Sequence, residues 1–295
     1  MRQNSLFLIF LSMRPRQWTK NLIIFAPLLF SQNLLTPGSS LKSALAFSFF
    51  CILSGCVYLL NDLIDLEQDK RHPVKSKRPL ASGKLDRSSA IIALIVLLVF
   101  SCAASMAFLN IAFIITAAVY LLLQVGYSTF LKHIVIIDVF SIAAGFLLRV
   151  IAGAEVIEVS FSTWLLFCTI LLSLFLALSK RRHELILLED DAIHHRKILF
   201  EYSPELLDQM ISIVTTATVI AYILYTVSEE TVKKFGTDNL KYTAPFVLYG
   251  IFRYLYLIHQ KNEGGSPEKV LLNDRPLLYG VIVYALTICY ILYFQ

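Results

Sequence analysis

Three aspartates at helical spacing, Asp62, Asp65 and Asp69, are the residues of this sequence best suited to carry out chemistry. Positions i, i+3 and i+7 of one helix fall within an arc of about 60°, so the three carboxylates are expected to point the same way. Aligned carboxylates repel one another unless a cation lies among them, and magnesium prefers such hard oxygen ligands. The spacing therefore predicts a magnesium site formed by these three side chains.

A run of basic residues follows the aspartates directly: Lys70, Arg71, His72, Lys75, Lys77 and Arg78. Carboxylates that hold a metal, beside cations that bind phosphate oxygens, are typical of a site for a diphosphate. A helix end whose acidic side chains are merely solvated is the alternative, and the adjacent cations argue against it. We therefore assign metal binding and catalysis to the aspartates, and substrate binding to Asn61, Arg71, Lys77 and Arg78.

The elements that must position these residues are membrane-spanning helices. Of the 295 residues, 57% are hydrophobic and only 16% are charged, and the mean hydropathy is +0.68. A span needs roughly 20 mostly apolar residues, and about nine segments qualify. They lie near 21–35, 42–60, 88–108, 111–130, 134–153, 161–179, 210–227, 244–258 and 276–294. The sequence predicts an all-α, polytopic membrane helical bundle that forms a single domain over residues 1–295.

Lysine and arginine are distributed unevenly between the predicted loops. Twenty of them fall on the side of the N-terminus and of the long loops 61–87 and 180–209, and four fall on the other side. Because basic residues favour cytoplasmic loops, we expect a cytoplasmic N-terminus, a C-terminus outside, and an active site facing the cytoplasm of an inner or plasma membrane. These basic residues form no continuous basic face, which argues against nucleic acid as a partner.

The stretch N-D-L-I-D-L-E-Q-D (61–69), followed by R-x-P-x-K-x-x-R-P-L-A-S-G, resembles the first aspartate motif of the UbiA superfamily of intramembrane prenyltransferases. Four more segments are similar to one branch of it, the decaprenyl-phosphate phosphoribosyltransferases: R-P-R-Q-W-T-K-N (14–21), Y-S-T-F-L-K-H-I-V-I-I-D (127–138), G-F-L-L-R-V-I-A-G-A (145–154) and L-A-L-S-K-R-R-H-E-L (176–185). The resemblance covers nearly the whole chain and implies a lipid-open cavity within the bundle. It also implies a Mg²⁺-dependent reaction between phosphoribosyl diphosphate and a polyprenyl phosphate.

The second long loop begins with basic residues where aromatic prenyltransferases of the superfamily carry a second aspartate motif. Cations at this place suit substrates with more phosphates to bind, which agrees with the phosphoribosyl branch. We assign substrate binding to Lys180, Arg181 and Glu184, and we expect Glu184 to orient Lys180 as an i,i+4 pair. The alternative is that these basic residues, at the cytoplasmic end of a span, only determine the membrane topology.

Four residues at the cytoplasmic borders of predicted spans are further candidates for substrate binding: Lys20, Asn21, Tyr127 and Lys132. Lys20 could instead be a snorkelling anchor, and Tyr127 an interfacial aromatic residue. The adjacent pair His194 and His195 lacks i,i+4 spacing and a third ligand, so we interpret both as solvated loop residues.

Two charged residues lie inside predicted spans, where charges are costly and normally face the bundle interior. Asp138 is close to the cytoplasmic end of its span, and we assign it a catalytic role in contact with substrate. Arg149 follows eleven residues later, about 16 Å further along the helix, so the two are too far apart to pair. For Arg149 a structural role and a lipid-phosphate role both stay open.

Two other functions fit parts of the sequence. The first is transfer of a prenyl group from a prenyl diphosphate to an aromatic acceptor, as in quinone or haem biosynthesis, and the missing second aspartate motif argues against it. The second is a transporter or membrane scaffold, which would suit the intramembrane charges but shows no inverted repeat and no Gly/Pro-broken pair of spans. The lipid bilayer is an expected partner, and a homo-oligomer is compatible with the sequence.

Overall fold

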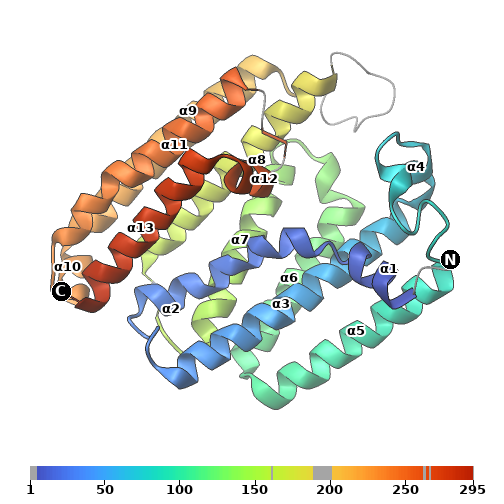
Figure 1. Ribbon diagram of the computed structural model, residues 1–295, viewed down its shortest axis with the longest axis horizontal. Coiled ribbons are helices and arrows are strands. Elements are labelled where there is room, and N and C mark those ends of the chain that lie inside the picture. The colour runs from blue at the N-terminus through green and yellow to red at the C-terminus, as the bar shows by residue number, and fades with distance from the viewer. Residues whose placement is uncertain (1–4, 161, 189–200, 262–263, 266, 295) are drawn as a thin grey trace. The chain divides into compact units, whose positions relative to one another are not determined.

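The computed structural model describes residues 5–160, 162–188, 201–261, 264–265 and 267–294 (Figure 1). These residues form helices joined by turns and contain no β-strand, which confirms the predicted all-α class. His194 and His195, which we interpreted as loop residues, lie outside the described ranges.

The chain forms two compact units. Unit 1 comprises Met1–Leu28, Leu34–Thr129 and Leu148–Ser160, and unit 2 comprises Leu29–Asn33, Phe130–Leu147 and Phe161–Gln295. Helix α7 contributes its first half to unit 2 and its second half to unit 1. The expectation of a single domain stays a prediction.

Unit 1 is built around the long helix α3, which contacts α1, α5, α6 and the 3₁₀ helix Pro15–Phe25. Its core includes Ile24, Phe50 and Phe113, each with no exposed surface. The bounds of its elements are α1 Ser5–Ser12, α2 Ala26–Phe30 (which leads into unit 2), α3 Pro37–Ile64, α4 Leu66–Arg71, α5 Arg87–Phe108 and α6 Ile111–Thr129.

Unit 2 is centred on the pair α8 and α9, and α9 and α13 also contact α11. Its core is formed by residues such as Val139, Phe175 and Leu207. The side chain of Ser203 accepts a hydrogen bond from Leu206 N–H and so caps the start of α9. The bounds are α7 Ile137–Val156, α8 Thr163–Leu188, α9 Pro204–Val227, α10 Glu229–Phe235, α11 Ala244–Gln260, α12 Pro267–Asn273 and α13 Arg275–Phe294.

Seven of the described helices are long and apolar enough to cross a membrane, namely α3, α5, α6, α7, α8, α9 and α13. The expected count of nine is not confirmed, because the segments predicted at 21–35 and 244–258 are not among them. The first is a 3₁₀ helix followed by the five-residue α2, and the second is α11, which has 17 residues. Since a 3₁₀ helix rises about 2 Å per residue, Pro15–Phe30 still covers about 30 Å.

The 3₁₀ helix Pro15–Phe25 is unusually long, because such helices rarely exceed a few residues. It packs so closely on α7 that a Cβ atom at Gly153 would collide with the backbone carbonyl of Ile24. Gly55 of α3 is in similar close contact with the side chain of Met13, which precedes the 3₁₀ helix. Close packing in unit 1 therefore fixes both ends of this segment.

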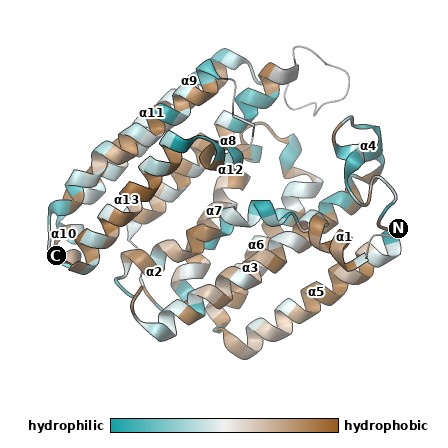
Figure 2. Cartoon of the chain, viewed as in Figure 1, coloured by the Kyte–Doolittle hydropathy of each residue, from teal (hydrophilic) through white to brown (hydrophobic). Residues whose placement is uncertain are grey.

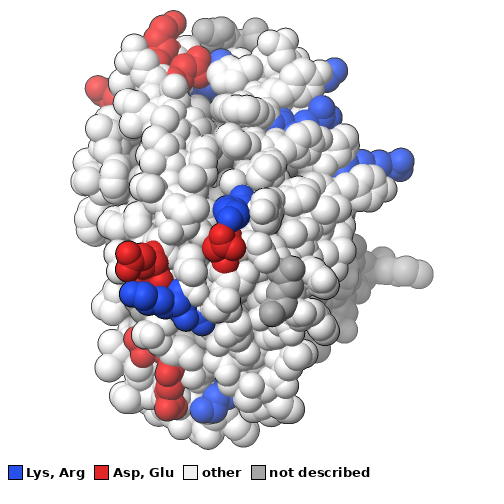
Figure 3. Space-filling model, turned by 90° about the vertical axis from the view of Figure 1, so that its left-hand side faces the viewer, with Lys and Arg blue, Asp and Glu red and all other residues white. Residues whose placement is uncertain are grey.

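Many large apolar side chains are exposed, as a multi-pass membrane protein requires. On α5 they include Ile92, Val96, Val99 and Phe100, each more than half exposed. Hydrophobic residues predominate along α5 and α13, whereas α4 is largely hydrophilic (Figure 2). One face of the protein is mostly uncharged, with Lys, Arg, Asp and Glu confined to separate groups (Figure 3).

Candidate active site

The aspartate stretch does not form the single continuous helix that its spacing predicts. Helix α3 ends at Ile64 and α4 begins at Leu66, because Asp65 leaves the α-helical region with φ −89° and ψ 11°. Hydrogen bonding continues through this break, since Asp65 N–H donates to Asn61 O (2.9 Å) and Asp69 N–H donates to Asp65 O (2.8 Å). Backbone hydrogen bonds therefore connect the end of α3 to α4 across the segment that carries the three aspartates.

Asp62 and Asp69 converge on one arginine, Arg78. Its Nη1 lies 3.2 Å from Asp62 Oδ1 and also donates to Asp69 Oδ2, while Arg14 Nη2 donates to the same oxygen of Asp62. Both carboxylates are buried, at 3% and 4% exposure, whereas the arginine side chains are about a quarter exposed. Two of the three expected ligands thus share one cation. We name Asp62, Asp69, Arg14 and Arg78 the first cluster.

Asp65, the third predicted ligand, is half-buried and lies at the break between α3 and α4. Among the described residues, no three His, Cys, Asp or Glu side chains are grouped closely enough to hold a metal ion. The three carboxylates are thus not drawn together in the described part of the chain, and their assignment as a metal-binding triad stays a prediction. The physical reason is that two guanidinium groups lie against the carboxylates and satisfy their charge.

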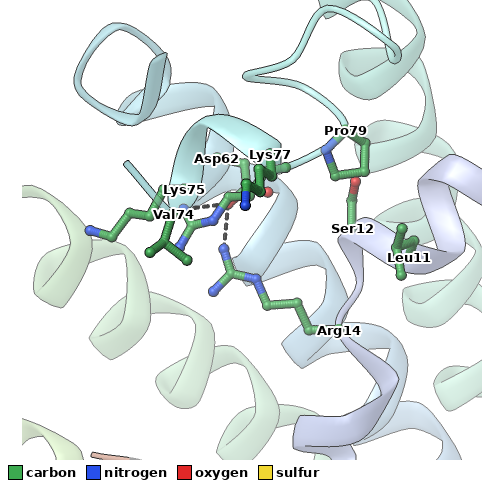
Figure 4. A pocket seen from close by; sticks show the side chains of 9 residues that line it. Leu11, Ser12, Arg14, Asp62, Val74, Lys75, Lys77 and Pro79 are labelled. Atoms are coloured by element: carbon green, nitrogen blue, oxygen red, sulfur yellow. Dashed lines mark hydrogen bonds and ion pairs between the residues drawn. The ribbon is translucent and has the colours of Figure 1, made fainter. Parts of the chain in front are cut away.

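A cavity of about 330 Å³ opens beside the first cluster (Figure 4). It lies between the end of α1 and the loop that follows α4. Arg14, Asp62 and Arg78 line it together with two further cations, Lys75 and Lys77. The remaining lining residues are Leu11, Ser12, Val74 and Pro79. The cavity thus offers cationic groups to an anion and has an apolar edge.

The carboxylates of the first cluster fit a hard divalent cation. Two buried carboxylates approach one positively charged group, and both supply the oxygen atoms that magnesium prefers. Next to Asp62, the side-chain oxygen of Asn61 is buried and has no hydrogen-bond partner. A buried oxygen of that kind is costly unless a ligand completes it. Asn61 Oδ1 is therefore a candidate contact for a metal ion, a water molecule or a substrate.

Arg14 is the cluster residue that sequence reasoning missed. Its backbone is left-handed (φ 53°), it caps the 3₁₀ helix as the residue before Pro15, and its guanidinium lies 4.7 Å from the ring centroid of Tyr58. Left-handed conformations are uncommon for non-glycine residues and often mark functional sites. The signal available in the sequence was its place at the start of the R-P-R-Q-W-T-K-N segment.

Asn21, predicted to bind substrate, has instead a buried structural position. It is 1% exposed, its Oδ1 accepts from Arg149 Nε (2.7 Å), and its Nδ2 donates to Ser54 Oγ (3.2 Å). Arg149 also donates to the hydroxyl of Tyr120 (2.8 Å). Asn21 contacts protein groups on both sides of its amide, which argues against a substrate contact. For Arg149 the structure favours the structural alternative.

A second group of charged residues lies in unit 2. Arg181 is 1% exposed; its Nε donates to Asp138 Oδ2 (2.6 Å), and its Nη1 donates to Glu184 Oε2. Lys180 Nζ lies 3.8 Å from Glu184 Oε1, so the two residues form the i,i+4 pair expected from the sequence. We name Asp138, Arg181, Glu184 and Tyr202 the second cluster.

Tyr202 belongs to this cluster through its hydroxyl, which donates to Asp138 Oδ1 (2.8 Å) and accepts from Ile136 N–H (2.7 Å). Burial raises the pKa of the Tyr202 phenol to about 12, so the donating proton is retained. Both oxygens of Asp138 are thereby bound, and the carboxylate has no exposed surface. Asp138, expected to contact substrate, and Arg181, expected to bind phosphate, are both enclosed by protein.

The remaining candidates have diverse surroundings. Arg71 and Lys77 are exposed, Lys20 and Tyr127 are half-buried, and Lys132 is buried in the 3₁₀ turn Leu131–His133. Lys20 donates to Gln17 Oε1 at 3.4 Å. Of these five residues, Lys77 lines the cavity of the first cluster.

The fold and this site define a membrane-embedded transferase. The model of the UbiA prenyltransferase family matches residues 22–274, and the chain belongs to this family.

Two relatives are named decaprenyl-phosphate phosphoribosyltransferase. The protein of Corynebacterium glutamicum is 32% identical over 288 residues, covering 95% of this chain and 85% of the relative. That of Mycolicibacterium smegmatis is 32% identical over 298 residues, covering 96% of this chain and 92% of the relative.

Among solved structures, a UbiA homologue from Archaeoglobus fulgidus bound to GPP and Mg²⁺ has a TM-score of 0.71 at 17% identity. The match covers 96% of this chain and 99% of the homologue. That likeness establishes a shared fold.

Proposed function

We propose that this enzyme transfers the phosphoribosyl group of 5-phosphoribosyl 1-diphosphate to a polyprenyl phosphate and releases diphosphate. The observation that carries the proposal is the first cluster, where two buried carboxylates and a cationic cavity suit a metal-bound diphosphate. The choice of donor and acceptor rests on the relatives named decaprenyl-phosphate phosphoribosyltransferase, which match nearly the full chain.

Asp62, Asp69 and Asn61 are the residues that would hold Mg²⁺, and Asp65 is the third carboxylate available in the same segment. When bound, the ion neutralises charge on the leaving diphosphate. The cations that line the cavity, Arg14, Lys75, Lys77 and Arg78, bind the phosphate oxygens and stabilise the charge that grows as the bond to the leaving group breaks.

The reaction is a substitution at C1 of the ribose. An oxygen of the polyprenyl phosphate forms the new bond to C1 as the C1–O bond to diphosphate breaks, and C1 gains oxocarbenium character as in other glycosyl transfers. The acceptor phosphate is already anionic and needs no general base. The protein therefore has to bind, orient and neutralise charge rather than move a proton.

Lys180 is the residue of the second loop that we propose binds a substrate phosphate. Its side chain is 39% exposed, in contrast to Arg181 at 1%. Arg181, for which the sequence suggested this role, is held between two carboxylates. Of the two cations predicted to bind phosphate, we therefore keep Lys180 as the phosphate contact and give Arg181 a supporting role.

Orientation in the membrane is part of the proposal. The excess of basic residues in loops 61–87 and 180–209 favours a cytoplasmic active site. On a cysteine-free background, Thr237→Cys should react with an impermeant reagent in intact cells and Ser76→Cys should not. The reverse pattern would show that the orientation is inverted.

The direct test is transfer of radiolabel from phosphoribosyl diphosphate to a lipid extract by the purified protein with polyprenyl phosphate and Mg²⁺. We expect a labelled ribosyl lipid and released diphosphate. If the protein ignores this donor and instead prenylates an aromatic acid, the phosphoribosyl assignment fails, while the assignment of the diphosphate site is retained.

A further inference from the structure

The hydroxyl of Tyr202 joins two parts of unit 2 that are far apart in the sequence. Tyr202 precedes α9, and the groups that it contacts, Ile136 N–H and Asp138 Oδ1, lie at the start of α7. Ile136 has φ 69°, a conformation that a β-branched residue adopts only under constraint. The N–H group of this constrained residue donates to Tyr202, so one hydroxyl stabilises both the turn and the carboxylate beside it.

A series of contacts leads from Tyr202 to the exposed end of Lys180. Asp138 accepts from Tyr202 on one oxygen and from Arg181 Nε on the other. The same guanidinium donates through Nη1 to Glu184, and Glu184 lies 3.8 Å from Lys180 Nζ. Exposure rises along this series, from 0% for the Asp138 side chain to 32% for Glu184 and 39% for Lys180. The buried part is therefore held by hydrogen bonds and ion pairs, and the residue at its end is accessible.

We propose that Tyr202 is a positioning residue for substrate phosphate binding, acting through Asp138, Arg181 and Glu184 on the ammonium group of Lys180. This inference rests on the proposed function, because it takes Lys180 as a phosphate contact. Tyr202 itself touches no substrate. It fixes the oxygen of Asp138 that Arg181 does not use, and so fixes the plane of the carboxylate to which Arg181 is bound.

A folding role alone would also explain a buried tyrosine, and the test must separate the two. The variant Tyr202→Phe removes one hydroxyl oxygen and keeps the ring. The matched control is Tyr222→Phe, since Tyr222 is also buried, belongs to α9, and bonds Thr243 Oγ1 at 2.6 Å. Both variants lose one buried hydrogen-bonded hydroxyl and both should lower thermal stability, Tyr202→Phe more so because one of its partners is a charged carboxylate.

The kinetic measurement is the Michaelis constant for each substrate and kcat, normalised to folded enzyme. We expect Tyr202→Phe to raise the Michaelis constant for one phosphate substrate about fivefold to tenfold with little change in kcat, and Tyr222→Phe to leave both unchanged. Separate titrations of phosphoribosyl diphosphate and of polyprenyl phosphate show which of the two substrates carries the phosphate that Lys180 binds.

The coupling between Tyr202 and Lys180 is measured in the double variant. In a Lys180→Ala background the effect of Tyr202→Phe on the Michaelis constant should disappear, because the effects of coupled residues are not additive.

An equal effect of Tyr202→Phe with and without Lys180 would overturn the inference and leave a folding role. An effect as large in Tyr222→Phe would do the same. The comparison is made with whichever diphosphate donor the wild type turns over. A wild type that uses a prenyl diphosphate therefore contradicts the proposed function, whereas loss of coupling to Lys180 contradicts this inference.

Discussion

The first and second clusters both pair carboxylates with arginine, and they differ in which member reaches solvent. In the first cluster the carboxylates Asp62 and Asp69 are buried, while Arg14 and Arg78 are about a quarter exposed and line a cavity. In the second cluster Arg181 is as buried as Asp138. An arginine side chain that borders a cavity can contact a bound ligand. An arginine side chain that is enclosed between carboxylates cannot. The comparison supports the proposal that the first cluster binds substrate and that the second cluster has a supporting role.

The largest effect is expected from the carboxylates of the first cluster. Asp62→Ala should lower turnover by at least about 100-fold, because it removes a proposed metal contact and leaves two cations without their shared partner. The matched control is Glu67→Gln, an acidic residue of α4 that is 73% exposed and pairs only at the surface with Lys70. Turnover by both variants is measured with and without EDTA. Full activity of the wild type in EDTA would contradict the metal assignment.

The second prediction compares the two clusters directly through magnesium. Arg78→Ala leaves Asp69 buried without that arginine and should lower the melting temperature, and added Mg²⁺ should restore it, since the ion can neutralise the same carboxylates. Arg181→Ala should cost about 3–5 kcal/mol, as expected when one partner of a buried pair is removed, and Mg²⁺ should restore none of it. The check is thermal unfolding of both variants in detergent across a magnesium titration. Equal rescue of the two variants would remove the distinction between the clusters.

A smaller effect is expected at Lys180. A charge-assisted contact with phosphate contributes roughly 1.5–3 kcal/mol, so Lys180→Ala should raise the Michaelis constant for one substrate by about 10- to 150-fold. The control is Lys233→Ala, because Lys233 forms the same kind of i,i+4 pair with Glu229 at an exposed site outside both clusters. Unchanged Michaelis constants in Lys180→Ala would return the basic start of the second loop to a purely topological role.

The smallest effect concerns pH and Tyr202. Burial raises the pKa of this phenol to about 12, above its usual value near 10. The protonated form is thus favoured in the folded state, and its contribution is complete below pH 10 and lost as the pH rises towards 12. We expect about 1–2 kcal/mol, seen as a stability advantage of wild type over Tyr202→Phe that shrinks across this window. An advantage that stays constant to pH 12 would show that the phenol does not titrate there.

The sequence was sufficient to predict the helical membrane class and the family, because each leaves a local signal. Apolar runs, helical spacing and a short basic motif are all visible without knowledge of the fold. The break at Asp65 was not predictable from spacing, since an aspartate inside an apparent helix and one at its end look alike in sequence. The same limit led to an expected triad where the structure pairs two carboxylates with arginines.

Residues whose roles depend on distant contacts could not be assigned from the sequence. Asn21 looked like a polar residue at a span border, but its position is determined by Arg149, which follows 128 residues later. Tyr202 gave no signal, because its partner Asp138 lies 64 residues earlier. Arg14 was missed because a left-handed backbone cannot be seen in a residue type. Burial of Arg181 likewise follows from packing, which residue spacing does not specify.

The absence of a side chain at Gly153 has a consequence for how this enzyme can vary. Because the carbonyl of Ile24 occupies the space that a Cβ would need, selection at position 153 acts on volume alone, whatever the chemistry of the replacement. Ile24 belongs to the same 3₁₀ helix that begins next to Arg14, so a residue of α7 without any functional group restrains a charge in the first cluster. Saturation mutagenesis should therefore give an all-or-none profile at Gly153, with glycine alone accepted.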